Sequence, residues 1–86
     1  MIIDPPEHLK EINDFIDRER RLLVTYESIV VWKRMFNSQL SWCLCKRLHD
    51  MGGTDYHIYR KITPEEARWV HENKGINDLF GQLEEE

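Results

Sequence analysis

Two cysteines and a nearby histidine are the side chains of this chain best suited to chemistry. Cys45 and His49 are four residues apart, so on a helix they share a face and can both reach one metal ion. Cys43 lies two residues before Cys45, about 200° around the same helix, and cannot join that pair. A structural zinc site uses two such pairs, and the sequence has no second one. We therefore predict no metal site and interpret both cysteines as small buried hydrophobic side chains.

The sequence contains no recognisable catalytic arrangement. No segment resembles the strained turn that carries a nucleophilic side chain, and the carboxylates fall on faces that we expect to be solvated. A chain of 86 residues also has little volume for a substrate pocket. We predict no catalytic residue, no cofactor and no enzymatic activity.

Length and composition restrict the kind of protein. The 86 residues make one domain, residues 1–86. Apolar residues are 41% and charged residues 33% of the chain, which is typical of a folded globule and not of a disordered segment. No apolar run approaches the roughly 18 residues of a membrane span, and no signal peptide opens the chain. With only two cysteines there is no disulfide framework, so we expect a cytoplasmic protein that does not associate with membranes.

Charge is distributed unevenly along the chain, whose net charge is −4. Residues 1–20 hold six acids and three bases, residues 21–62 seven bases and three acids, and residues 63–86 seven acids and two bases. A basic segment between acidic ends can hold an anionic partner, or it can pair with those ends after folding. Both interpretations remain open at this point.

Residues 5–36 are predicted to form one long helix. The segment Asp4-Pro5-Pro6-Glu7 offers a cap, a proline for the first turn and an acid at the capping-box position. Apolar residues then recur at seven-residue steps, in adjacent rows, from Leu9 to Phe36. A strand is the competing prediction for residues 22–32, which are rich in β-branched and aromatic side chains, but strict alternation fails there.

The length of this helix raises the question of a partner. A helix over residues 5–36 is roughly 48 Å long at 1.5 Å per residue, whereas a globule of this size is about 30 Å across. Either the helix breaks near residues 18–21 or the protein is a homodimer. Residues 22–36 are apolar nearly all round, which indicates burial on several sides, one of them closed by a second subunit or a target.

The rest of the chain is predicted to pack on this helix. Ser38 is expected to cap a second helix that ends at Gly52-Gly53, and residues 55–62 are expected to form a short β segment or a loop. Thr63-Pro64-Glu65-Glu66 predicts the start of a third helix, ended by Gly75.

Residues near the C-terminus complete the predicted fold. Asn77 is expected to cap a last turn, and residues 84–86 are expected to be a frayed tail. The predicted fold class is mainly α: a small helical bundle, with a long N-terminal helix and one short β segment.

The aromatic content suggests that the protein binds another protein. Three Trp, three Tyr and three Phe are many for a small chain, and Trp, Tyr and Arg are the residues that anchor interfaces. The predicted partner-binding residues are Trp32, Lys33, Arg34, Met35, Trp42, Lys46, Arg47, Tyr56 and Tyr59. The opposite interpretation is that these rings complete a small core, and it applies most strongly to Trp42 and Trp69.

The main functional hypothesis is a regulator, inhibitor or adaptor that acts by stoichiometric binding to a protein target. In this hypothesis an aromatic and aliphatic patch with a basic rim covers a functional surface of the target. Small, charged chains without catalytic motifs are typical of accessory proteins, including virus-encoded modulators of a host.

Nucleic-acid binding by a helix-turn-helix arrangement is the alternative hypothesis. Asn37 and Gln39 are then the candidates for contacts with base edges. The expected phosphate contacts come from the central basic segment, at Lys46, Arg47, Arg60 and Lys61. The acid-rich ends oppose this hypothesis, because backbone affinity depends on the neutralisation of phosphates.

Overall fold

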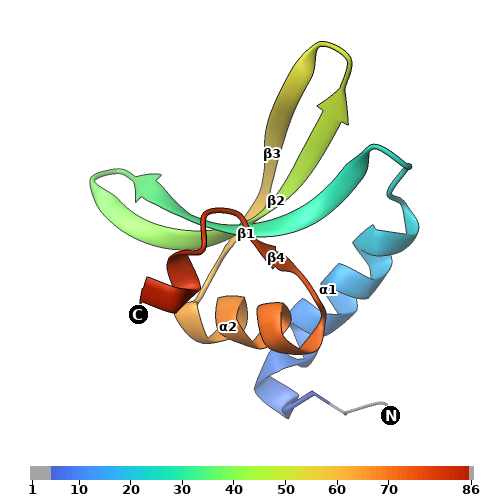
Figure 1. Cartoon of the computed structure of the whole chain (residues 1–86). Helices are drawn as coiled ribbons and strands as arrows, with labels where there is room; N and C mark the ends of the chain where they lie inside the picture. The colour runs from blue at the N-terminus through green and yellow to red at the C-terminus, as the bar shows by residue number, and fades with distance from the viewer. Residues whose placement is uncertain (1–4, 86) are drawn as a thin grey trace.

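The computed structural model describes residues 5–85 and the side chains of residues 5–83. Along the chain the elements are η1 (Glu7–Leu9), α1 (Lys10–Arg21), β1 (Glu27–Phe36), β2 (Gln39–Asp50), β3 (Gly53–Ile62), α2 (Pro64–Asn73), β4 (Asn77–Asp78) and η2 (Gln82–Glu85). The chain is 43% strand and 34% helical, so the prediction of a mainly α helical bundle is wrong. The protein is a small α/β fold built on a four-stranded mixed sheet (Figure 1).

The long N-terminal helix is the first error of the sequence interpretation. Only residues 10–21 form α1, and residues 27–36, predicted as the far end of the helix, form β1. Ile29, Val30 and Val31 are all buried, because β1 has apolar neighbours on both faces of the sheet. A strand buried on both faces loses its alternation, so the seven-residue pattern was mistaken for a helix. The proposed cap at Asp4 lies outside the described residues.

The second predicted helix is also wrong, because residues 39–50 form β2. Asn37 and Ser38 both have positive φ, of 47° and 69°, and together make the two-residue turn that joins β1 to β2. Such turns match the twist of antiparallel strands and favour Asn at their first central position. Ser38 is therefore a hairpin residue and not a helix cap.

The strands are arranged in the order β3-β2-β1-β4. β1 pairs with β2 and β2 with β3 in antiparallel register, whereas the short β4 lies parallel to β1. The β2–β3 ladder has an irregularity between Leu44 and Cys45, where Tyr59 is the extra residue of β3. The formation of β3 over residues 53–62 confirms the extended segment that the sequence predicted before Thr63.

Both helices cover the same side of the sheet (Figure 1). The main core lies between them and the strands, and its buried members are Leu9, Ile12, Ile16, Ile29, Val31, Trp42, Leu44, Ile62, Ala67, Val70, Ile76 and Leu83. With its twelve residues, α1 is about 18 Å long. It fits within the 40 × 33 × 21 Å molecule, so the mismatch in length that suggested a homodimer is absent.

The third predicted helix is confirmed as α2. The Thr63 hydroxyl accepts the Glu66 backbone N–H at 3.0 Å, and the Glu66 carboxylate accepts the Thr63 N–H at 2.9 Å. This reciprocal capping box is encoded by four consecutive residues and needs no distant contact. After α2, Gly75 takes a positive φ of 68° and turns the chain toward β4.

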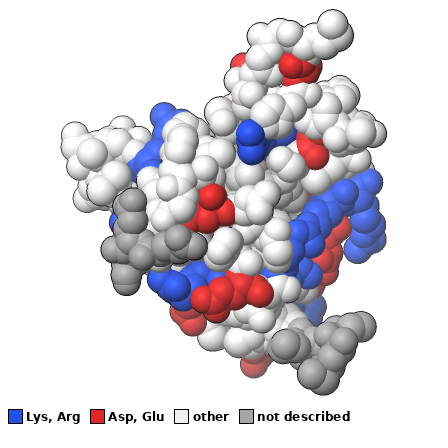
Figure 2. Space-filling model, in the orientation of Figure 1, with Lys and Arg blue, Asp and Glu red and all other residues white. Residues whose placement is uncertain are grey.

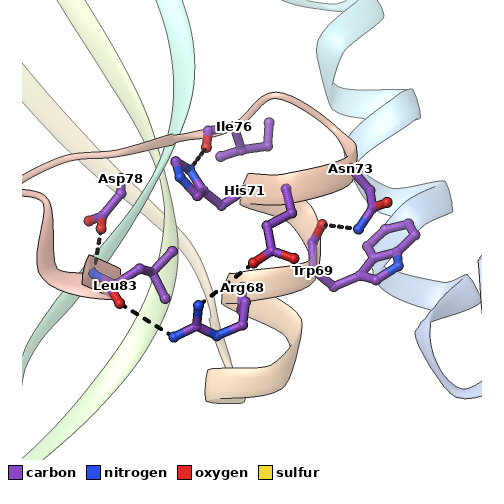
Figure 3. Close-up of polar contacts among 8 residues, drawn as sticks. Arg68, Trp69, His71, Asn73, Ile76, Asp78 and Leu83 are labelled. Atoms are coloured by element: carbon purple, nitrogen blue, oxygen red, sulfur yellow. Dashed lines mark hydrogen bonds and ion pairs between the residues drawn. The ribbon is translucent and has the colours of Figure 1, made fainter. Parts of the chain in front are cut away.

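The C-terminal segment is tied to the sheet and to α2 by polar contacts. The Asp78 carboxylate, not Asn77, holds the last turn by accepting the Leu83 N–H at 2.5 Å (Figure 3). The Gln82 amide bonds both the N–H and the carbonyl of Lys33, each at 2.9 Å, and so satisfies the edge of β1. Of the predicted frayed tail, residues 84 and 85 belong to η2, and Glu86 lies outside the described residues.

Candidate binding surface

The sheet divides the predicted partner-binding residues between its two sides. Successive side chains of a strand point to opposite faces, so neighbours in the sequence are separated. Lys33, Met35, Trp42, Lys46 and Tyr59 lie on the side covered by the helices. Trp32, Arg34, Arg47 and Tyr56 lie on the other side, which we call the open face. The structure therefore brings together four of the nine predicted residues.

Three of the predicted residues on the helix side, Trp42, Tyr59 and Lys46, pack against other parts of the fold. Trp42 is only 2% exposed and belongs to the main core, as the opposite interpretation of its ring predicted. Tyr59 meets Phe15 of α1 edge to face, with ring centroids 5.5 Å apart. Lys46 lies over the Tyr59 ring and pairs with Glu27 at 3.6 Å. Tyr59 thus joins the sheet to α1, and Lys46 is held within the sheet, whereas Met35, also on this side, is 57% exposed.

The open face has a small apolar layer of its own. Val30, Cys43 and Cys45 are fully buried there, although no helix covers them. They are covered by half-buried side chains, namely Trp32, Phe36 and Leu79. Leu79 is held in place by a backbone hydrogen bond of 3.0 Å to the Val31 carbonyl. Because this apolar layer supports them from below, the larger rings form a packed surface and not a set of loose side chains.

Above this layer, rings and cations alternate across the face. The Lys61 ammonium lies 4.8 Å from the Phe36 ring centroid, and the Arg34 guanidinium lies 5.3 Å from the same ring. Arg34 is also 4.8 Å from the Trp32 ring. We call the set Trp32, Arg34, Phe36, Tyr56, Lys61 and Phe80 the aromatic–cation ladder.

The ladder ends in its two most accessible rings. Trp32 contacts Tyr56 at 5.4 Å and Phe80 at 5.9 Å between ring centroids. Tyr56 is 37% and Phe80 61% exposed, and the neighbouring Ile58 is 42% exposed. Tyr56 comes from β3 and Phe80 from the segment after β4, so two separate parts of the chain meet Trp32 of β1.

The basic side chains of the open face differ from those elsewhere in their pairing with carboxylates. On the helix side and the helices, six cations lie within 4 Å of a carboxylate, namely Lys10, Arg18, Lys46, Arg60, Arg68 and Lys74. In the lower half of Figure 2, where the helices lie, basic and acidic surfaces accordingly adjoin. On the open face Arg34, Arg47 and Lys61 have no carboxylate partner among the described residues, and β1–β3 place no Asp or Glu on that side.

The two cysteines are brought together by the strand that the sequence interpretation missed. Residues two apart on a strand share a face, and the Cys43 and Cys45 sulfurs are 3.4 Å apart, so their predicted separation around a helix is wrong. Cys43 also donates to the Trp32 carbonyl at 3.2 Å. The hydrogen bond from Cys45 and the charge of Arg34 lower the pKa of Cys43, whereas the bond to Cys43 and burial raise that of Cys45. The part of the chain that the structure describes holds no cluster of three metal-ligating side chains.

Cavities in the surface are formed mainly on the helix side. One of about 400 Å³ is lined by Trp42 and Pro64, one of about 290 Å³ by Phe15 and Arg60, and one of about 220 Å³ by Trp69. None of these three is lined by a residue of the aromatic–cation ladder. The ladder therefore suits a broad contact better than the enclosure of a small ligand.

Three members of the ladder, Phe36, Lys61 and Phe80, are absent from the predicted protein-binding residues, although Lys61 was a candidate for phosphate contacts in the alternative hypothesis. Phe36 would have been found by applying the two-residue period of a strand from Trp32. The same period from Tyr56 reaches Ile58 and then Arg60, and Lys61 joins their face only because Tyr59 is an extra residue in β3. Phe80 gives no such signal, because nothing near it in the sequence relates it to β1. Its place depends on the parallel pairing of β4 with β1.

No protein family, no curated protein and no solved structure matches this chain. Among the helices of residues 5–85, none combines the length and the apolar character needed to cross a bilayer. The geometry of the open face is therefore the basis of the functional proposal.

Proposed function

We propose that this protein is a small non-enzymatic regulator that binds a protein target stoichiometrically, as an inhibitor or adaptor. The observation that carries the proposal is the aromatic–cation ladder, a packed row of rings and of cations without a carboxylate partner among the described residues, on the side of the sheet without helices. Protein interfaces are enriched in Trp, Tyr and Arg, with the strongest contributions near the centre. Trp32 has that central place, and Arg34 and Lys61 form part of the basic rim.

Binding by this face would act through occlusion of the target. The rings are already fixed by contacts with one another and with the cations, so little side-chain entropy is lost when a partner arrives. None of the three cavities described above is lined by a ladder residue, so the ladder offers a partner an open surface and not an enclosed site. This supports a stoichiometric role over a catalytic one.

The helix-turn-helix hypothesis is withdrawn, because its recognition helix is β2. Asn37, its candidate for base contacts, forms the β1–β2 turn, and Lys46 and Arg60 pair with carboxylates on the helix side. We extend the proposal to a cytoplasmic protein, since Cys43 and Cys45 are free thiols, as suits a reducing compartment. Homodimerisation is retained only as an outcome that sedimentation tests, with the outer edge of β3 as the surface available for it.

Site-specific photo-crosslinking tests the proposal in cells of the source organism. A photoreactive phenylalanine analogue replaces Phe80 in one variant and Leu40 in another. Phe80 and Leu40 are both 61% exposed but lie on opposite sides of the sheet, so they form a matched pair. We expect one discrete protein adduct from position 80, which disappears when Trp32→Ala is added. The purified target should then form a complex of fixed stoichiometry.

Adducts of the same pattern from both positions would contradict the proposal, because they would indicate random collision. An adduct from position 40 alone would place the interface on the helix side. Turnover of a substrate by the purified chain would contradict the non-enzymatic role.

A further inference from the structure

The charge pattern of the open face restricts what kind of protein can bind there. Resting on the proposed function, we infer that the partner presents an acidic segment to the aromatic–cation ladder, with carboxylates beside apolar side chains. The inference concerns the chemistry of the target and goes beyond the existence of an interface.

The first step is the contrast in pairing between the two sides of the molecule. Lys46 on β2 and Arg60 on β3, which face the helices, have carboxylates at 3.6 and 2.9 Å. Arg34, Arg47 and Lys61 have none among the described residues. Among the described residues of β1–β3, these two bases that face the helices thus have acidic partners, whereas those of the open face do not. A partner that supplies carboxylates there completes pairs that the chain does not make itself.

The second step is the fixed geometry of these cations. The Arg34 guanidinium lies between the rings of Trp32 and Phe36. The Lys61 ammonium also lies over the Phe36 ring. A guanidinium packed on rings keeps its hydrogen-bond donors at its edge, where a carboxylate can be bound by two of them. Because the side chain is already ordered, forming that pair costs little conformational entropy.

Arg47 adds a third cation to the open face. It lies on the open face, paired in register with Ser28 on one side and Tyr56 on the other. Its Nε–H is buried and has no hydrogen-bond acceptor in the described structure. A buried Nε–H is out of reach of a partner, so this donor does not identify one, and Arg47 contributes to the inference through its positive charge.

The apolar part of the partner is argued from the exposed rings. Phe80, Ile58 and Tyr56 border the cations and leave contiguous apolar surface in water. Covering such surface is favourable in proportion to its area. An acidic segment that also carries apolar side chains satisfies both components, whereas a purely acidic one satisfies only the cations.

A single-stranded nucleic acid fits this face less well than an acidic protein. Bases bind by stacking on open ring faces, but cations lie over the rings of Trp32 and Phe36. The three open-face cations also belong to a chain of net charge −4, so the rest of the molecule carries −7 and repels an extended polyanion. A short acidic segment meets only the local positive charge.

The test uses a defined peptide in place of the unidentified target. The probe is a synthetic peptide that alternates Glu pairs with Leu and Phe, and its control has Gln at every Glu position. Binding is followed by amide chemical shifts of the full-length protein. We expect saturable shifts confined to the ladder strands with the Glu peptide, and at least tenfold weaker binding of the Gln peptide. The affinity for the Glu peptide should fall several-fold as salt is raised.

Charge variants locate the effect. The double variant Arg34→Gln/Lys61→Gln should weaken Glu-peptide binding roughly tenfold or more, and Lys61→Gln alone, at an exposed side chain, should weaken it severalfold without loss of fold. The matched control is Lys10→Gln/Arg21→Gln on α1, which removes the same two charges from exposed positions outside the ladder. This control should bind as the native protein does.

The outcomes separate the inference from the proposed function. Equal binding of the Glu and Gln peptides would overturn the acidic partner and leave a protein-binding face. If the Glu peptide gave no saturable shift while the crosslinked target still bound, the acidic partner would likewise be overturned and the protein-binding face retained. Tighter binding of a thymidine oligonucleotide of equal charge would overturn both, and self-association at the ladder, shown by sedimentation, would replace the acidic partner with a second copy.

Discussion

The strongest test of the two-sided sheet is to remove one tryptophan from each side. Trp32 on β1 and Trp42 on β2 lie near each other in the pairing of these two strands, but their rings point to opposite faces of the sheet. The same substitution, to Ala, should therefore have different consequences. We expect Trp42→Ala to destabilise the fold severely and Trp32→Ala to leave a folded protein that has lost its binding surface.

The magnitudes follow from burial. A fully buried Trp removes about 200 Å² from water, which at about 25 cal/mol per Å² is about 5 kcal/mol, close to the 3–5 kcal/mol typical of Trp→Ala in a core. Trp42, at 2% exposed, falls in this range. Trp32 is half-buried, so we expect a loss of about 2 kcal/mol. A domain of 86 residues has a free energy of unfolding of about 4–13 kcal/mol. Trp42→Ala therefore removes a large share of the total, and Trp32→Ala does not.

Urea unfolding followed by circular dichroism measures both variants. The native protein and Trp32→Ala should show the same folded signal, with a lower midpoint for the variant, while Trp42→Ala should be partly or wholly unfolded without denaturant. A loss for Trp32→Ala as large as that for Trp42→Ala would refute the reasoning, because Trp32 would then be a core residue. Tolerance of Trp42→Ala would show that the faces of β2 are assigned the wrong way round.

Three further predictions concern the turn, a buried phenol and the thiols. Ser38→Gly should raise the free energy of unfolding by about 0.5 kcal/mol in urea melts, because glycine takes a positive φ without strain; a small loss, as at a helix cap, would contradict the hairpin. Burial, followed by the charges of Glu19 and Glu27, raises the pKa of Tyr59 to about 12, so the unfolded phenol loses its proton first. Stability should therefore fall by about 2 kcal/mol as pH rises from 10 to 12. Tyr59→Phe should remove that loss, and an unchanged pH dependence would contradict the assignment. Cys43 and Cys45 are fully buried, so Ellman's reagent should label them only as fast as the protein opens; immediate labelling of either would contradict the packed layer under Trp32.

The local signals of the sequence were sufficient for some elements. The capping box at Thr63 needs only residues within four positions of one another, and α2 forms where it was predicted. The extended segment before Thr63 was also found, because its apolar and polar residues alternate. Of the residues that composition suggested for an interface, the structure fixes only the positions. Trp32, Arg34, Arg47 and Tyr56 do lie together on one face.

The tertiary structure alone decided the central strands and the membership of the surface. Between residues 27 and 50 the buried positions are consecutive, because both faces of β1 and β2 are covered by other parts of the chain. A consecutive apolar run fits a helix and a doubly buried strand equally well, and only pairing with distant residues separates them. Phe80 reaches Trp32 from 48 positions away in the sequence, through β4. A sequence determines which side chains are available, but the hydrogen-bonded register of the sheet determines which of them share a face, since one residue of shift moves a side chain to the opposite side.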